Sequence, residues 1–433
     1  MIHKAAASRR IVGMLAAMPP TPDAARPGSG APDRGREDSC PGALRLHTAD
    51  DGALARVRVP GGLLTDRQAL VLADAASELG DGALETTSRG NVQLRGLPSD
   101  SGRELGTRLR AAGLLPSDSH ERVRNIVASP SAGLDGAGHA DVQAWTRELD
   151  ALLCASEQAA GLSGKFLFAL DDGRGDVAAL DADVTLIAAP GGGALLRLGR
   201  AATARRVPAG AEVRHALAAA LEFLAAVRAG GTPAWHLRDL PALLDPGAEP
   251  LPVSEGRAPL VGPVPGGLSV GLRFGRVSAE QWRLLAGASA GELRVTPWRG
   301  VVLPGAAHER LAELAAAGLR TDPGSPWERA TACTGLPGCA KSLADVRADA
   351  ALALSRPGGG GLPVHWSGCE RRCGHPAGEW VDVLATGQGY RVTAHSGVHS
   401  TSHASRTLHT SHTSQDLTTE EMAEAVAEAR RIK

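Results

Sequence analysis

In two separate parts of the chain, a stretch in which polar and apolar residues alternate is followed by a stretch with apolar residues at helical spacing. Alternation of the two kinds predicts short strands at 53–59 and 268–274. Apolar residues at helical spacing then predict helices at about 66–79 and 279–288. The chain is therefore expected to repeat one supersecondary unit.

Both predicted helices carry the start signal known as a capping box. Thr65 is followed three residues later by Gln68, and Ser278 by Gln281. In this motif the hydroxyl accepts from the third helical amide while the glutamine side chain reaches back to the cap residue. Both helices are thus expected to begin directly after the hydroxyl residue.

A hairpin follows the helix in both copies. Its first strand ends in the sequence TSRG at 87–90 in the first copy and TPWRG at 296–300 in the second. After the next strand, helices at about 102–112 and 306–317 close the units. The order β-α-β-β-α is typical of an α+β, ferredoxin-like sandwich.

The predicted organisation is an α+β fold in which two ferredoxin-like half-domains alternate with two mixed α/β domains, with a pseudo-twofold internal repeat. The expected segments are a disordered extension (1–40), the first half-domain (41–118), a mixed domain (119–205), a connector (206–255), the second half-domain (256–320), a cysteine-containing domain (321–393), a His/Ser/Thr-rich linker (394–415) and a C-terminal helix (416–433).

Composition narrows the class of protein. A chain of 433 residues with 43% hydrophobic and 21% charged residues is long enough for two or three globular domains. The net charge of −1 argues against nucleic acid or a membrane surface as a partner. The apolar run at 11–18 is too short for a clear export signal, so a cytoplasmic location is expected.

Four of the six cysteines form two tight pairs in the C-terminal third, Cys333-x5-Cys339 and Cys369-x3-Cys373. Four thiolates are what a [4Fe–4S] cluster requires. Three alternatives remain open, namely a structural zinc ion, disulfides and unrelated buried thiols. Zinc sites favour shorter spacings, and disulfides favour small secreted domains, so the cluster is preferred.

Arginines gather near the predicted strand ends of the first half-domain. Arg56 and Arg58 alternate on one strand face, and further arginines follow at positions 89, 95, 122 and 124. Their guanidinium groups suit carboxylates, which predicts an anionic pocket. A solvated sheet face with scattered surface arginines explains the same spacing equally well. The chain has only four lysines, two of them in its tails, which draws attention to Lys165 and Lys341.

Histidines provide further potential metal ligands. His365 and His375 flank the second cysteine pair, and a structural role is the preferred interpretation of both. His395, His399 and His403 would line up on a helix, but the residues between them are poor helix formers, so a solvated linker is favoured over a metal site. The sequence has no dinucleotide-binding fingerprint, and electrons are therefore expected from a partner.

Together, the RVPGG strand, the TSRGNVQLRG hairpin, the RNIV segment and the cysteine quartet resemble the sirohaem sulfite/nitrite reductase superfamily over about residues 41–393. The resemblance implies a [4Fe–4S] cluster, a cradle for a carboxylate-rich tetrapyrrole, and two sulfite/nitrite reductase-type domains at 119–205 and 321–393. It also implies that Cys373 bridges cluster and sirohaem in the reductases. Arg58, Arg89, Arg124 and Lys165 match substrate- or cofactor-binding positions, and Arg124 and Lys165 are candidates for catalytic residues.

The segments RNIVASPSAG and GCERRCGHP resemble most the precorrin-3B synthase branch of that superfamily. Sulfite reductases have a Lys-x-Lys pair where this chain has Lys165-Phe166-Leu167. The resemblance implies an O2-dependent monooxygenase that hydroxylates C20 of precorrin-3A and forms a γ-lactone. It further implies a mononuclear non-haem iron and an external NAD(P)H-linked electron donor. The alternative is an assimilatory sulfite or nitrite reductase that binds sirohaem.

Overall fold

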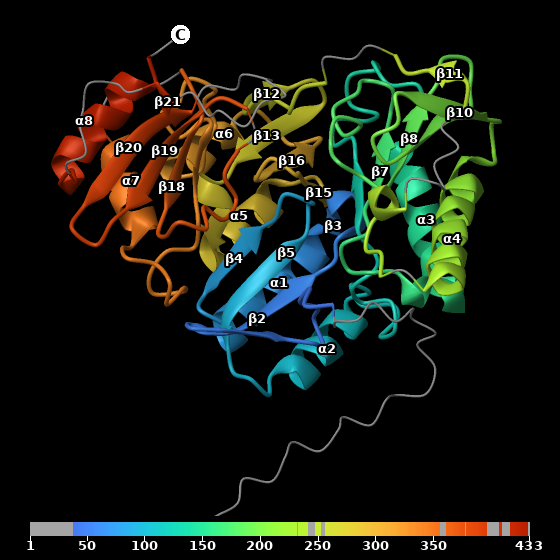
Figure 1. Ribbon diagram of the computed structural model, residues 1–433, viewed down its shortest axis with the longest axis horizontal. Helices are drawn as coiled ribbons and strands as arrows, with labels where there is room; N and C mark the ends of the chain where they lie inside the picture. Colours follow the sequence, from blue (N-terminus) through green and yellow to red (C-terminus); the bar gives the residue numbers. More distant parts are fainter. Residues whose placement is uncertain are drawn as a thin grey trace, which may run out of the picture.

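The structure is a computed structural model that describes residues 38–231, 233–240, 247–252, 256–355, 361–376, 378–395, 407–408 and 416–431. The described residues form four sheets. Two of them belong to the half-domains at the centre of the molecule, and the other two lie on opposite flanks (Figure 1). The predicted fold class, with ferredoxin-like half-domains and mixed α/β domains, is confirmed.

Each half-domain is a five-stranded antiparallel sheet with two helices. The first sheet has the strand order β1-β2-β5-β4-β14, and the second has the order β12-β13-β16-β15-β3. The elements of the first are β1 (His47–Ala49), β2 (Gly52–Val57), α1 (Asp66–Leu79), β4 (Ala83–Thr86), β5 (Val92–Leu97) and α2 (Gly102–Ala111). Those of the second are β12 (Gly262–Val264), β13 (Gly267–Gly271), α5 (Ala279–Ala288), β15 (Glu292–Val295), β16 (Gly300–Pro304) and α6 (Arg310–Ala316).

The two half-domains exchange their edge strands. β3 (Leu63–Thr65) lies in the first repeat but pairs with β15 of the second, and β14 (Arg276–Ser278) pairs with β4 of the first. α1 and α5 share one core, where Trp282 donates from Nε1 to the carbonyl oxygen of Ala69 over 3.0 Å. The central unit is therefore one folded body built from both copies.

Local sequence signals set the starts of α1 and α5. Thr65 and Ser278 each accept from the third helical amide, and both capping boxes are complete. Two expected elements are shorter than predicted. The strand expected at 268–274 ends at Gly271 because residues 273–275 form a 3-10 turn, and α6 begins only at Arg310.

One flanking domain has the sheet order β11-β10-β9-β8-β7-β6, in which β6, β7 and β8 are parallel. Its elements are β6 (Ile126–Ala128), α3 (Val142–Ala155), β7 (Phe168–Asp171), β8 (Val184–Ala188), β9 (Ala194–Leu198), β10 (Thr203–Val207), α4 (Glu212–Gly230) and β11 (Glu249–Pro250). The segment 206–255, expected as a connector, supplies α4 and β11 to this domain, because its apolar face completes the core around Phe223.

The other flanking domain has the sheet order β17-β18-β19-β20-β21. In this sheet β17, β18 and β19 are parallel. Its elements are β17 (Ala330–Ala332), α7 (Val346–Leu354), β18 (Val364–Ser367), β19 (Trp380–Ala385), β20 (Tyr390–His395), β21 (Thr407–Leu408) and α8 (Thr419–Ala429). The expected C-terminal helix, α8, packs into this domain, where Trp366 donates from Nε1 to the sulfur of Met422.

None of the helices in the described ranges is both long and apolar enough to cross a membrane. Most of the extension (1–37) and of the His-rich segment (396–406 and 409–415) lies outside the described residues. The disordered extension and the solvated linker therefore stay predictions.

Candidate functional site

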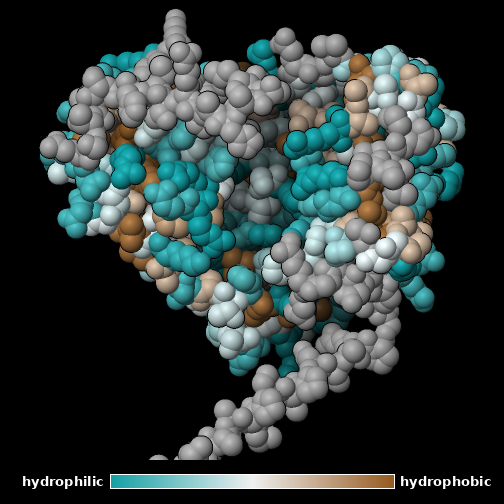
Figure 2. All heavy atoms as spheres, in the orientation of Figure 1, coloured by the Kyte–Doolittle hydropathy of each residue, from teal (hydrophilic) through white to brown (hydrophobic). Residues whose placement is uncertain are grey.

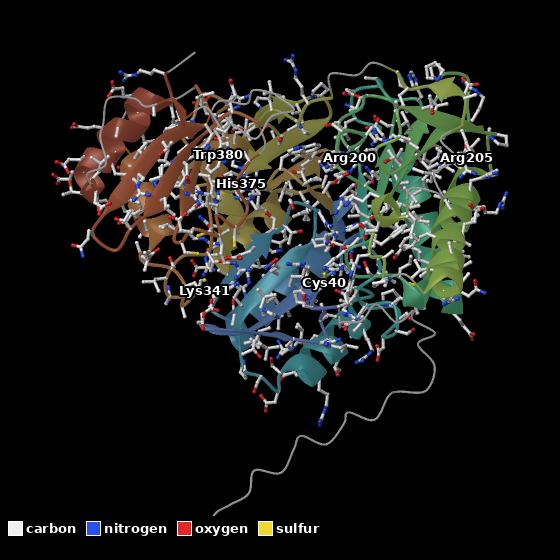
Figure 3. The ribbon with its side chains drawn as sticks, viewed as in Figure 1. Cys40, Arg200, Arg205, Lys341, His375 and Trp380 are labelled. Carbon is white, nitrogen blue, oxygen red and sulfur yellow. The ribbon has the colours of Figure 1, made fainter. Side chains whose placement is uncertain are left out.

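A central hollow separates the two flanking domains, and hydrophilic side chains line both of its visible walls (Figure 2). Figure 3 labels residues around it: His375 and Trp380 come from the domain of β17–β21, Arg200 from the turn between β9 and β10, and Cys40 from the chain that precedes β1. The candidate site consists of the cysteine loops and the arginine cluster near this hollow.

Parallel strands bring the cysteine loops together. β17 and β18 are in register with Ala332 opposite Trp366, so the loops that follow both strands leave the same edge of the sheet. The amide of Cys333 donates to Trp366, and the amide of Gly368 donates to the Cys333 sulfur over 3.2 Å. Leu343, from the loop after Cys339, donates its amide to the Gly368 carbonyl oxygen.

Four thiolates can bind either one zinc ion or a [4Fe–4S] cluster, and the two sites differ in sulfur spacing. A tetrahedral zinc site with Zn–S bonds of about 2.3 Å holds its sulfurs roughly 3.8 Å apart. Within the described residues, no three of these sulfur atoms lie within 4.8 Å of one another. Each thiolate of a [4Fe–4S] cluster binds a different iron and needs a wider spacing. In the described residues the quartet is therefore not as compact as a tetrahedral zinc site, and the cluster stays a prediction.

Asp50 and Arg95 of the first half-domain hold the loop that carries Cys339. Asp50 accepts from the amide of Ala340 over 2.6 Å, and Arg95 donates from Nη2 to the Gly338 carbonyl oxygen over 3.0 Å. Arg95 is itself fixed by Asp51 through two contacts of 2.8 Å. The position of the cysteine loop therefore depends on the sheet of β1 and β2.

Arg58 and Arg89 are brought together, as expected for an anionic pocket. Arg58 is buried and donates from Nε to the Arg122 carbonyl oxygen, while its Nη1 is buried with no partner in the described ranges. Burial, and then the neighbouring charge of Arg56, lower the pKa of Arg58 to about 9. The positive charge of the half-buried Arg89 also lowers the pKa of Arg58, and burial lowers the pKa of Arg89 itself. A carboxylate here would satisfy the unpaired donors.

Lys165 and Cys40 lie beside this arginine pair. The Lys165 ammonium group stands 4.4 Å above the ring of Trp235, and the Gly164 carbonyl oxygen accepts from Nη2 of Arg58 over 3.5 Å. Burial raises the pKa of the Cys40 thiol, whereas the nearby Arg58 and Arg56 lower it. The chain at Asp38 and Cys40 thus lies beside the arginine cluster. Sequence patterns could not predict this because the Gly164 amide, which donates to Asp38, is 126 positions away in the chain.

Arg124 lines the same cavity as Arg58, but protein partners already engage it. Its guanidinium group binds both carboxylate oxygens of Asp150 at 2.6 Å and donates to the Leu114 carbonyl oxygen at 3.0 Å. These contacts occupy its Nε, Nη1 and Nη2 atoms. A role for Arg124 in binding substrate or in catalysis stays a prediction.

His365 is the best placed of the predicted iron ligands. It is fully buried, its Nδ1 contacts the Thr331 hydroxyl at 2.8 Å, and its Nε2 has no hydrogen-bond partner in the described residues. Burial, with Arg299 and His375 nearby, lowers its pKa to about 3, which keeps the imidazole neutral.

His375 and His395 each stack on Trp380, with ring centroids 5.2 and 4.9 Å from that of the indole. His399 and His403 lie outside the described residues. In the described part of the chain, neither His365 nor His375 is joined by two further ligands, so these residues do not assemble a mononuclear iron site.

Comparison with known proteins shows what the half-domains and the fold resemble. The sequence model of the nitrite/sulfite reductase ferredoxin-like half domain matches residues 47–112 and 263–319. The structure of the NirA protein of Mycobacterium tuberculosis superposes with a TM-score of 0.65 over 86% of this chain and 79% of that one, at 21% identity. The two half-domains thus match the nitrite/sulfite reductase ferredoxin-like half domain, and the overall fold is that of NirA.

Among curated proteins, the chain is similar to a precorrin-3B synthase of Sinorhizobium sp., with 29% identity over 386 residues that cover 82% of each protein. It is also similar to a ferredoxin–nitrite reductase of Synechococcus elongatus, at 39% identity over 127 residues. That second match covers 28% of this chain and 25% of the reductase.

Proposed function

We propose that this protein is a precorrin-3B synthase, an O2-dependent monooxygenase that hydroxylates C20 of precorrin-3A and closes a γ-lactone. The observation that carries the proposal is the similarity to a precorrin-3B synthase along 82% of both chains, whereas the match to the nitrite reductase covers about a quarter of each.

The position of Leu167 supports this choice over an oxyanion reductase. Sulfite reductases resemble this chain but carry a second lysine at this position. Here Leu167 is 5% exposed and packs against Val127, Ala169 and Val177. One cation fewer faces the pocket, which weakens the binding of a small oxyanion more than that of a large substrate with several carboxylates.

In the proposed reaction the arginine cluster binds and orients the macrocycle. Arg58 and Arg89 would pair with its acetate and propionate arms, and Lys165 would add a third cation. Arg58 and Arg89 come from the first half-domain and Lys165 from the flanking domain. Because the cations approach from two domains, they would fix both the position and the tilt of the ring. One oxygen atom of O2 enters the product and the other leaves as water, with two electrons and two protons supplied by an external NAD(P)H-linked donor.

Cys333, Cys339, Cys369 and Cys373 would hold the [4Fe–4S] cluster, which supplies electrons one at a time when bound. The family resemblance also implies a mononuclear iron. Since the described residues do not assemble its ligands, no step is derived from it.

A sirohaem-dependent nitrite or sulfite reductase is the second candidate, favoured by the higher local identity of 39% to a nitrite reductase. Absorption spectra of the purified protein separate the two, because sirohaem gives an intense Soret band and a cluster alone gives a weak brown shoulder.

The decisive test is incubation with precorrin-3A without O2, followed by admission of O2 and mass spectrometry. A product heavier by one oxygen atom, labelled when 18O2 is used, is expected. Reduction of sulfite or nitrite by protein that leaves precorrin-3A unchanged would establish the alternative.

A further inference from the structure

The hairpins β4–β5 and β15–β16 share one turn geometry but differ in which residue carries the cation. The amide of Thr87 donates to the Asn91 carbonyl oxygen, and the amide of Thr296 donates to that of Gly300, both over 2.9 Å. When the two turns are aligned by this hydrogen bond, Arg299 takes the position of Gly90, and Trp298 takes the position of Arg89. The two arginines are therefore not equivalent, although both follow a threonine closely in the sequence.

The turn requires left-handed backbone at the position of Arg299. Gly90 adopts φ +66° there, and Arg299 adopts φ +58°. Glycine takes this conformation without steric cost, whereas a side chain with a Cβ atom is strained in it. Strained positions of this kind cluster at functional sites. An arginine in this place suggests that its side chain has a use in the second hairpin.

The side chain of Arg299 reaches the second cysteine loop. Its stem crosses Gly275, where an added methyl group would lie 3.1 Å from Cγ and Cδ. A methyl group on Gly374, the residue after Cys373, would lie 3.5 Å from Nη2 of Arg299 and 3.9 Å from Cε1 of His365. The guanidinium group thus lies beside the end of the cysteine quartet.

No carboxylate in the described part of the chain pairs with this guanidinium group. Nη1 of Arg299 is buried without a hydrogen-bond partner. Burial lowers the pKa of Arg299, and the cation of Arg347 lowers it further, while Glu85 opposes them. Glu85 is already bound by Arg347 at 2.5 Å and by Arg276 at 3.2 Å. A half-buried cation with unfilled donors is suited to an anionic ligand.

We propose that Arg299 binds a carboxylate arm of the tetrapyrrole on the side of Cys373, opposite the arms bound through Arg58 and Arg89. This inference rests on the proposed function and extends it, because it assigns a substrate-binding residue to the second half-domain. Trp298, at the position of Arg89, contributes instead to packing: it contacts the apolar cluster of Val127 and Leu167 in the flanking domain.

The test compares wild-type protein with Arg299→Gly, using metal-free uroporphyrin as the probe and fluorescence titration to obtain Kd. Glycine is the residue that the first hairpin uses, so this variant relieves the strain and removes only the side chain. We expect Kd to rise by roughly 10- to 150-fold, the range for loss of a charge-assisted hydrogen bond, with Tm unchanged or higher. Arg283→Gln, which removes an exposed ion pair between Arg283 of α5 and Asp74 of α1, is the control and should leave Kd unchanged.

Arg89→Gln separates this inference from the proposed function. If wild-type protein binds uroporphyrin, Arg89→Gln weakens binding and Arg299→Gly does not, only the assignment of Arg299 is wrong. If wild-type protein does not bind the macrocycle at all, both the assignment and the proposed function are wrong. Arg299→Met, which keeps the apolar stem, provides a second measurement if Arg299→Gly lowers Tm; wild-type affinity in Arg299→Met would again contradict the assignment.

Discussion

Arg95 of β5 donates from Nη2 to the carbonyl oxygen of Gly338, 3.0 Å away and one residue before Cys339. The contact joins residues 243 positions apart in the chain. Because Asp51 holds the same guanidinium group through two hydrogen bonds, the arginine is a fixed support for the cysteine loop.

We therefore predict that Arg95→Met weakens retention of the cluster. The variant loses charge-assisted hydrogen bonds to Asp51 and Gly338, each worth about 1.5–3 kcal/mol, so the loop of Cys339 should open more often. Loss of iron to a chelator, followed by absorbance, should be faster than in wild-type protein. Arg108→Gln, on the exposed face of α2, is the matched control and should lose iron at the wild-type rate.

Arg89→Gln and Arg124→Gln should have opposite phenotypes. No carboxylate is paired with Arg89 in the described residues, so its loss should weaken binding of the macrocycle by roughly 1.5–3 kcal/mol and leave Tm nearly unchanged. Arg124 is paired with Asp150, and breaking this largely buried pair should cost about 3 kcal/mol of stability. Titration with uroporphyrin and thermal unfolding measure the two effects. Equal loss of binding at unchanged Tm in both variants would show that Arg124 binds the macrocycle as Arg89 does.

The cysteine quartet should account for all cluster iron. Protein purified without O2 should contain about four iron and four sulfide per chain, and Cys369→Ser should contain far less of both. Cys154→Ser changes a half-buried cysteine of α3 outside the quartet and should keep the wild-type content. Full occupancy by zinc in active wild-type protein would contradict the assignment.

Asp176 should make stability fall as the pH rises. It accepts from the Ser129 hydroxyl and the Val177 amide through Oδ1, while burial, and then the charge of Asp171, raise its pKa above the ordinary value of about 3.9. The folded state therefore retains a proton that the unfolded state releases. Its stabilising effect is complete below about pH 4 and is lost as the pH approaches the raised pKa.

Asp176→Asn removes this titration but keeps an oxygen acceptor. The free energy of unfolding of the variant relative to wild type should rise from pH 5 to pH 8, by about 1.4 kcal/mol for each pH unit up to the raised pKa. The same difference at both pH values would show that Asp176 is not the titrating group.

Sequence patterns located the features whose partners are close in the chain. The starts of α1 and α5 follow from capping boxes only four residues long, and both are confirmed. The cysteine spacing indicated a metal centre because the two cysteines of each pair are close in the chain. Contacts between distant segments were not predictable: Asp150 occupies Arg124 across 26 positions, and the edge strands pair with the other repeat.

The turn of the second hairpin shows a different limit. The sequence shows an arginine shortly after a threonine in both copies, which suggests that Arg89 and Arg299 correspond. Only the backbone hydrogen bonds of Thr87 and Thr296 reveal the shift of one residue. Side-chain spacing in a turn does not define its register, because two turns with the same hydrogen bond can carry the arginine at different positions.

The exchange of β3 and β14 between the half-domains has a consequence for the origin of this architecture. A polypeptide encoding only one half would leave one sheet edge without its partner strand and would carry a strand with nowhere to pair. Two identical copies could complete each other by giving and receiving that strand. Gene duplication and fusion of such a swapped homodimer would produce the present topology without any new pairing, and would then free each copy to diverge, as Gly90 and Arg299 have done.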